Sequence, residues 1–189
     1  MEPNTGTPAG AADRALALLR ECGAETMAHP GGTLLAHLCR VQDRLALWQA
    51  RPALRLAGLC HAFYGTDGFP GALLPVTRRA ELTAVIGDEA ESIVHLYAAC
   101  DRAATYPALG RPEAPFHDRF TGELHVPGPR ARRDFAELSA ANELDLARLD
   151  PAFRDRWGAD LLALFTRLRP LLSADAWLDC RTVLATPAR

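Results

Sequence analysis

Lysine is absent from this sequence, so all 21 basic residues are arginine. The 23 acidic residues bring the formal net charge to -2, which gives no overall attraction to nucleic acid or to an anionic membrane. No apolar stretch approaches the ~20 residues that a membrane-spanning helix requires. We therefore expect neither a nucleic-acid nor a membrane partner, and the sequence leaves the oligomeric state open.

Cysteines are few, odd in number and widely spaced within helical patterns: Cys22, Cys39, Cys60, Cys100 and Cys180. A disulfide framework or a structural zinc site would show paired, closely spaced cysteines. The segment 1–12 is small and polar, without the basic start and apolar run of a signal peptide. We expect unpaired, reduced cysteines in a cytoplasmic protein.

The hydrophobic pattern predicts an all-α protein: a single helical bundle of about eight helices with one long proline-rich loop. A chain of 189 residues suits one domain, here 12–189 after a disordered N-terminus of 1–11. Apolar residues recur at helical spacing, most clearly from Leu34 to Trp48. The expected helices cover residues 13–22, 34–48, 52–63, 77–87, 88–100, 130–149, 151–168 and 173–184. Capping residues are expected at Thr77, at Asp88 with Glu91 as a capping box, and at Asp150.

The helical pattern stops between residues 104 and 129, where five prolines leave room for no more than a short hairpin around Thr121–Gly122. A loop of this length inside a compact domain is usually functional or mobile, so it is a candidate lid. His117 and Arg119 on this loop are candidates for binding an anionic substrate. The alternative is that they belong to a solvated surface.

Several polar side chains occupy positions where the helical pattern places the core. His37 lies at the edge of the apolar stripe that contains Leu34 and Val41, and His61 ends an apolar helix. Asn142 and Asp145 fall on the inward stripe of the 130–149 helix. Imidazoles from facing helices are how bundles build metal sites, and buried amides or carboxylates need partners. The alternative is that each is a core residue with an ordinary hydrogen-bond partner.

The segment 61–69, HAFYGTDGF, passes from the end of an apolar helix into a turn with two glycines and several polar groups. Such a turn suits a ligand site at a helix end, and it also suits an ordinary connection between helices. Tyr64, Thr66 and Asp67 are its candidate functional residues.

The order of these features resembles the HD superfamily of metal-dependent phosphohydrolases. His37 is separated by 23 residues from His61, which ends an apolar helix, and this order is similar to the start of an HD domain. Residues 86–94 and 138–145 are similar to segments of the alarmone hydrolases of that superfamily, and the His-x-x-Tyr-Gly-Thr stretch resembles a group of uncharacterised HD-like proteins. The resemblance covers roughly residues 25–150.

The sequence departs from the HD pattern at several positions. Ala62 replaces the aspartate of the His-Asp pair, and Asn142 stands where the family has its last aspartate ligand. The acidic pair that the alarmone hydrolases carry a few residues after His-Asp falls at Gly65 and Thr66.

The resemblance therefore implies a divalent transition metal ion, such as Fe, Mn or Zn, held by His37, His61 and Asn142. A neutral set of this kind suits a transition metal better than magnesium. Asp145 is the candidate for a further, negatively charged ligand, with Asp67 as the alternative.

Three functions follow from these patterns. The first is an HD-like metal-dependent hydrolase acting on a small phosphorylated or otherwise anionic metabolite, with Tyr64, Thr66 and Asp67 at the mouth of its site. The second is an HD-derived iron-dependent oxygenase. The third is a degenerate domain that binds a small molecule or a protein partner without metal, and the loss of the HD aspartate favours it.

Overall fold

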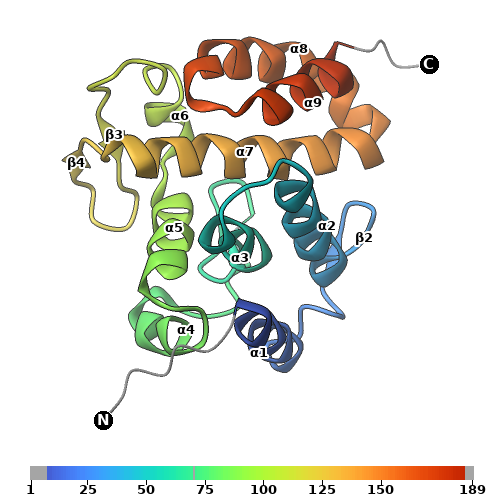
Figure 1. Cartoon of the computed structure of the whole chain (residues 1–189), viewed down its shortest axis with the longest axis vertical. Coiled ribbons are helices and arrows are strands. Elements are labelled where there is room, and N and C mark those ends of the chain that lie inside the picture. The colour runs from blue at the N-terminus through green and yellow to red at the C-terminus, as the bar shows by residue number, and fades with distance from the viewer. Residues whose placement is uncertain (1–7, 70, 186–189) are drawn as a thin grey trace.

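The computed structural model describes residues 8–69 and 71–185 (Figure 1), and it confirms an all-α fold. Within these residues there are nine α-helices, two short 3-10 helices and two two-stranded hairpins. The helices are α1 (Pro8–Glu21), α2 (Leu34–Leu47), α3 (Pro52–Cys60), α4 (Arg79–Ile86), α5 (Asp88–Ala99), α6 (Arg102–Thr105), α7 (Pro129–Leu149), α8 (Pro151–Arg167) and α9 (Ala174–Leu184). The 3-10 helices are Val76–Arg78 and Arg169–Leu171, and the strands are β1 (Ala28–His29), β2 (Gly32–Thr33), β3 (Phe116–His117) and β4 (Leu124–His125).

Helix α7 is the central element of the fold. It contacts α2, α3 and α5 on one side and α8 and α9 on the other, and Figure 1 shows it crossing the molecule between these two groups. A helix with neighbours on opposite sides is buried over most of its circumference, which explains why α7 buries polar as well as apolar side chains. Its polar residues therefore have to find partners inside the protein.

Helices α2 and α3 pack closely because α3 carries Gly58 at the contact. A Cβ atom at this position would lie 2.5 Å from Cδ1 of Leu45 on α2. The missing side chain lets the two helices approach. His37 on α2 and His61, which follows the last residue of α3, therefore lie close together.

Several helices begin, or are capped, at residues other than those that the sequence predicted. Helix α1 begins at Pro8, so 8–11 are helical and not disordered, while 1–7 lie outside the described residues. Thr77 caps no helix, because it lies inside the 3-10 turn that precedes α4. Gly87, at φ 82°, is the residue before α5, and Asp88 is the first residue of the helix instead of its cap. Asp150 does cap α8, as predicted, by accepting the Phe153 N–H.

The segment 104–129 begins with the last two residues of α6 and contains, as predicted, a short hairpin around Thr121–Gly122. Arg132 on α7 anchors the first part of this segment. Its buried guanidinium donates to three backbone carbonyls of the segment, those of Leu109 at 2.7 Å, Arg111 and Pro112. The segment is therefore tied to the central helix at one end.

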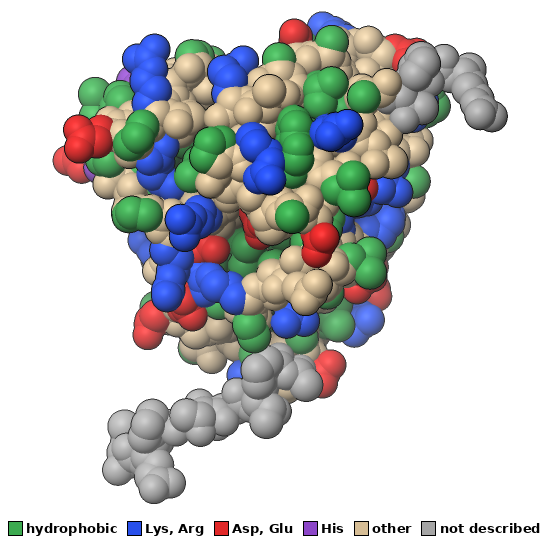
Figure 2. Space-filling view, turned by 45° about the horizontal axis from the view of Figure 1, so that its top comes forward, with side chains coloured by type: hydrophobic (Ala, Val, Ile, Leu, Met, Phe, Trp, Pro, Cys, Tyr) green, Lys and Arg blue, Asp and Glu red, His purple; other side chains and the backbone are tan. Residues whose placement is uncertain are grey.

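All five cysteines are free, as the sequence predicted. In the face that Figure 2 shows, arginine and carboxylate side chains lie interspersed. Of the helices in the described part of the chain, none has both the length and the apolar character needed to cross a membrane.

Candidate functional site

A pocket of about 1130 Å³ opens between α7 and α8. We call it the α7–α8 pocket. His29, His37, His61 and Ala62 line it, together with the turn that contains Thr66 and Asp67. Its other walls are α6 with the two residues that follow it, the stretch of α7 around Asn142, and one face of α8. Ligand sites in helical proteins commonly occupy such spaces between helices.

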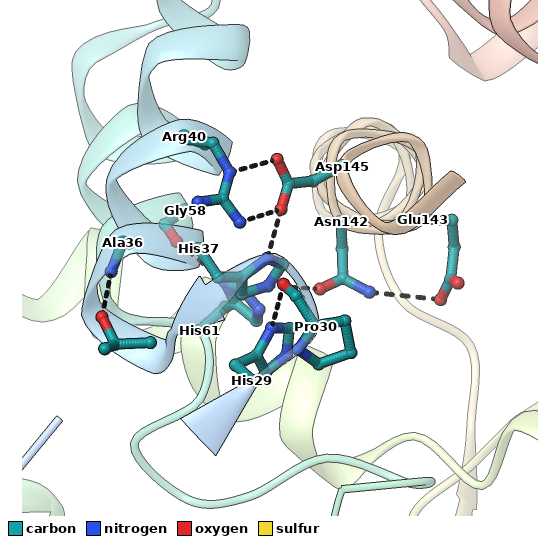
Figure 3. A network of polar contacts seen from close by, with 11 residues as sticks. His29, Pro30, Ala36, His37, Arg40, Gly58, His61, Asn142, Glu143 and Asp145 are labelled. Carbon is teal, nitrogen blue, oxygen red and sulfur yellow. Dashed lines mark hydrogen bonds and ion pairs between the residues drawn. The ribbon is translucent and has the colours of Figure 1, made fainter. Parts of the chain in front are cut away.

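His37 is fixed at both of its ring nitrogens (Figure 3). Its Nδ1 lies 2.7 Å from Oδ2 of Asp145, and its Nε2 lies 3.1 Å from Oδ1 of Asn142. Because a carboxylate can only accept, Nδ1 carries hydrogen and donates to Asp145. Its Nε2 consequently faces another oxygen acceptor inside the protein, where His37 is only 1% exposed. Two facing acceptors are stabilised by a positive centre between them, either a proton on Nε2 or a metal ion.

Asp145 is held by two basic side chains at once, those of Arg40 and His37. It accepts from Arg40 through Nε at 2.8 Å and through a terminal nitrogen at 2.9 Å, in addition to His37. Burial would raise the pKa of this carboxyl, but the bonds from His37 and Arg40 outweigh that and lower it to about 2. Asp145 is therefore an ionised group behind His37, and it does not face the pocket.

His61 presents the same arrangement from α3. Its Nδ1 lies 2.8 Å from the carbonyl oxygen of Gly58, so Nδ1 donates and the lone pair remains on Nε2. Burial, followed by repulsion from His37, lowers the pKa of His61 to about 3. The imidazole is neutral at neutral pH. Its ring lies edge-on to that of His37, with centroids 5.3 Å apart.

Asn142 connects the two histidines to a second group of charges. Its Nδ2 donates to Oε1 of Glu143 at 3.2 Å, so its Oδ1 is the atom that faces His37. Glu143 accepts from Arg102 at 3.0 Å, and the backbone N–H of Arg102 donates to Asp67 at 2.8 Å. A continuous set of polar contacts thus runs from Asp145, behind His37, to Asp67 at the pocket.

His29 is a site residue that the sequence reasoning missed. Its ring stacks on that of His37 with centroids 4.1 Å apart and an interplanar angle of 23°. Burial and the neighbouring His37 lower its pKa to about 4. The Pro30-Gly31-Gly32 stretch is the only local signal, and it predicts a turn. Gly31 is required there, because its φ is 77° and a Cβ atom would lie 2.5 Å from Cδ1 of Leu149.

The structure brings together some of the predicted site residues and leaves others outside the pocket. Thr66, Asp67, His37, His61 and Asn142 line it. Tyr64 does not, since its buried hydroxyl donates to Glu91 at 2.9 Å behind the turn. His117 and Arg119 are also outside the lining. His117 lies in β3, and Arg119 donates to the carbonyl of Ala98 at 2.6 Å.

Other residues take part in the pocket lining that the sequence did not predict. They are His29, Arg102, Glu143 and the α8 residues. Of the segment 104–129 only Tyr106 and Pro107 are in the lining, so the expectation that this segment covers one side of the site holds only for its first residues.

The residues present can be compared with those that the implied metal ion needs. In the described part of the chain, no group of three or more His, Cys, Asp or Glu side chains is arranged to hold a metal ion. A set that includes the amide remains: Nε2 of His37, Nε2 of His61 and Oδ1 of Asn142. Nε2 of His37 and Oδ1 of Asn142 lie 3.1 Å apart. Two imidazole nitrogens and an amide oxygen are donors that a transition metal ion accepts.

Fold and site define an all-α protein with buried, anchored histidines at the floor of a large pocket. A family model described as a domain of unknown function (DUF6817) matches residues 18–102. The chain is similar to that family over the segment that carries His29, His37 and His61, while α7 and α8 lie beyond it. Comparison of the chain with curated proteins and with solved structures found no match.

Proposed function

We propose that this chain is an HD-like, metal-dependent enzyme that hydrolyses a small molecule bound in the α7–α8 pocket. One observation carries the proposal: both buried histidines donate from Nδ1 to a fixed acceptor, which leaves Nε2 of each for a positive centre beside Asn142. Histidines that bind metal are oriented in this way, by a carboxylate or a backbone carbonyl on the far nitrogen.

Each residue of the site has a separate task in this proposal. His37, His61 and Asn142 would hold the ion, which would act as a Lewis acid toward water and substrate. Asp145 fixes the ring of His37, and Arg40 compensates the charge of Asp145. Glu143 orients the amide of Asn142, and Arg102 compensates the charge of Glu143. Asp145 is thus a positioning residue here and not a direct ligand.

Metal titration of the purified protein, after treatment with a chelator, tests the proposal. Calorimetry with Zn²⁺, Mn²⁺ and anaerobic Fe²⁺ is expected to show one ion per chain. Asn142→Leu is expected to weaken that binding by at least about tenfold while the melting temperature stays near wild type. The exposed His125 on β4 provides a matched control, since His125→Leu removes an imidazole outside the pocket. No binding by wild type, or equal binding by both variants, would refute the proposal.

A second candidate is a metal-free domain that binds a small molecule in the same pocket. The direct contact between His37 and Asn142 favours it, because a proton on Nε2 would satisfy both groups without an ion. In that case Asn142→Leu is expected to leave ligand binding intact and to cost on the order of 1–3 kcal/mol of stability, because its partners lose a hydrogen bond.

The iron-dependent oxygenase differs from the hydrolase in needing more ligands. Such proteins hold two irons, and beyond His37, His61 and Asn142 the described residues offer no second cluster of His, Cys, Asp or Glu. Oxygen uptake by protein reloaded with Fe²⁺, compared with protein reloaded with Zn²⁺, would distinguish the two reactions. We therefore rank hydrolysis first.

A further inference from the structure

The walls of the α7–α8 pocket above the histidines are largely apolar. On the α8 side they consist of Phe153, Trp157, Leu161 and Leu164, and Phe69 and Leu146 face the same space. The α8 residues recur at helical spacing on one face, so a continuous apolar strip of about three turns borders the cavity. Trp157 is 42% exposed. Such a strip is suited to an apolar ligand body, because burying it removes this surface from water.

Charged groups in the same lining are poorly matched to a polyphosphate. Among the described residues that line the pocket there are two arginines, Arg102 and Arg167, against three carboxylates, Asp67, Glu143 and Asp160. Arg102 is engaged by Glu143 and by the hydroxyl of Tyr97. Binding a phosphate chain normally requires several free cationic donors, and this lining has too few.

Arg167 is the exception in this lining. It lies near the C-terminal end of α8, is exposed, and has no ion pair or side-chain hydrogen bond in the described part of the chain. Asp160 lies seven residues earlier on the same helix and also lines the pocket, so a second negative charge on a ligand would meet repulsion there. The rim is thus suited to a single anionic group.

We infer that the α7–α8 pocket takes a monoanionic substrate with a large apolar body, which lies along α8 with its charged group at Arg167, and not a nucleotide or other polyphosphate. The inference rests on the proposed function, because it names the substrate class of the same site. It narrows the expectation of a small phosphorylated metabolite to compounds with one negative charge and considerable apolar surface.

Binding of straight-chain carboxylates to metal-free protein tests this inference. Calorimetry with butanoate, hexanoate, octanoate and decanoate, below micelle-forming concentrations, is expected to show an affinity that rises about fourfold with each buried methylene. Pyrophosphate and ADP are expected to bind more weakly than decanoate. An affinity that is independent of chain length, or tighter binding of pyrophosphate or ADP than of decanoate, would overturn the inference.

Two pairs of variants assign the binding to this pocket. Leu161→Arg places a charge in the apolar strip and is expected to weaken decanoate binding by at least about tenfold. Leu178→Arg, at a position 62% exposed on α9, is its matched control and is expected to bind as wild type does. Equal binding by both variants would place the ligand elsewhere and overturn the inference.

The second pair separates charge recognition from apolar burial. Arg167→Gln is expected to weaken decanoate binding while leaving decanol binding unchanged, and the exposed Arg133, which does not line the pocket, gives the control Arg133→Gln. Decanoate binding that is unaffected by Arg167→Gln would contradict the role of Arg167.

These experiments are independent of the metal titration. If the proposed function fails, no ion binds but the chain-length dependence remains. If only the substrate class is wrong, an ion binds at His37 and His61 while the chain-length dependence is absent.

Discussion

Acid should destabilise this protein through His61 well before its carboxylates are protonated. The folded protein holds His61 neutral, with a pKa of about 3, whereas an exposed histidine in the unfolded chain titrates near 6.5. Between these values the unfolded state binds one more proton than the folded state. The stabilising contribution is therefore complete above pH 6.5 and is lost as the pH falls from 6.5 toward 3.

The magnitude of this loss follows from the interval between the two pKa values. Each pH unit below 6.5 costs about 1.4 kcal/mol, so His61 alone should remove roughly 2–3 kcal/mol of unfolding free energy by about pH 4.5. Burial of the ring is complete, so solvent screening reduces this little. Asp145 does not interfere, because its pKa shift from 3.8 to about 2 affects stability only at lower pH.

Urea unfolding followed by tryptophan fluorescence measures this effect. Wild type, His61→Gln and His125→Gln would be compared between about pH 7.5 and pH 4.5 in the presence of a chelator. His61→Gln is expected to flatten the pH dependence by roughly 2–3 kcal/mol, whatever its stability at pH 7.5, because glutamine does not titrate. His29 contributes in the same window to wild type and variant alike, so the difference isolates His61. Parallel curves for wild type and His61→Gln would refute the reasoning.

Three further changes test other parts of the structure. Asp145→Asn should lower metal affinity about 10–100-fold and destabilise the fold by roughly 1–3 kcal/mol, because Arg40 and His37 lose an ionised acceptor. Calorimetry and urea unfolding measure the two effects, and unchanged values for both would contradict the role of Asp145. Gly58→Ala should lower the unfolding free energy by about 1–3 kcal/mol, because the added methyl group would clash with Leu45. A variant as stable as wild type would show that the packing of α2 on α3 does not need the glycine. Arg132→Met should release residues 109–112 and raise the rate of their amide hydrogen exchange, whereas Arg133→Met, at an exposed position, should not. Equal exchange rates in both variants would argue against anchoring by Arg132.

Helix positions were accessible from the sequence because periodicity and capping are local properties. The stripe from Leu34 to Trp48, Pro52 at the start of α3, and Asp150 as the cap of α8 all lie where the pattern predicts. The caps at Thr77 and Asp88 were wrong for a physical reason. Thr77 lies inside the 3-10 turn before α4, and Gly87 alone separates α4 from α5, so that Asp88 is already helical. Glu91 is bonded to Tyr64 and Arg79 instead of the helix terminus.

Inward placement of His37, His61, Asn142 and Asp145 followed from the same local patterns. Their side chains are buried because each helix has an apolar face, and a polar residue on that face is carried into the interior. Their individual roles did not follow, since partner choice depends on which helices are neighbours. Asp145, expected as a ligand, is instead bonded to Arg40 and His37, and no local signal distinguishes these two roles.

The sequence by itself determined the all-α class, the free cysteines and the residues that point inward, because period, composition and capping act over a few residues along one chain. Only the tertiary structure decided which of those residues share a cavity. Contacts such as Asp145 on His37, and the α8 wall facing the histidines, join segments far apart in the sequence. They arise from helix packing around α7, where the approach of α2 and α3 at Gly58 and the burial of α7 from both sides set distances that no local pattern contains.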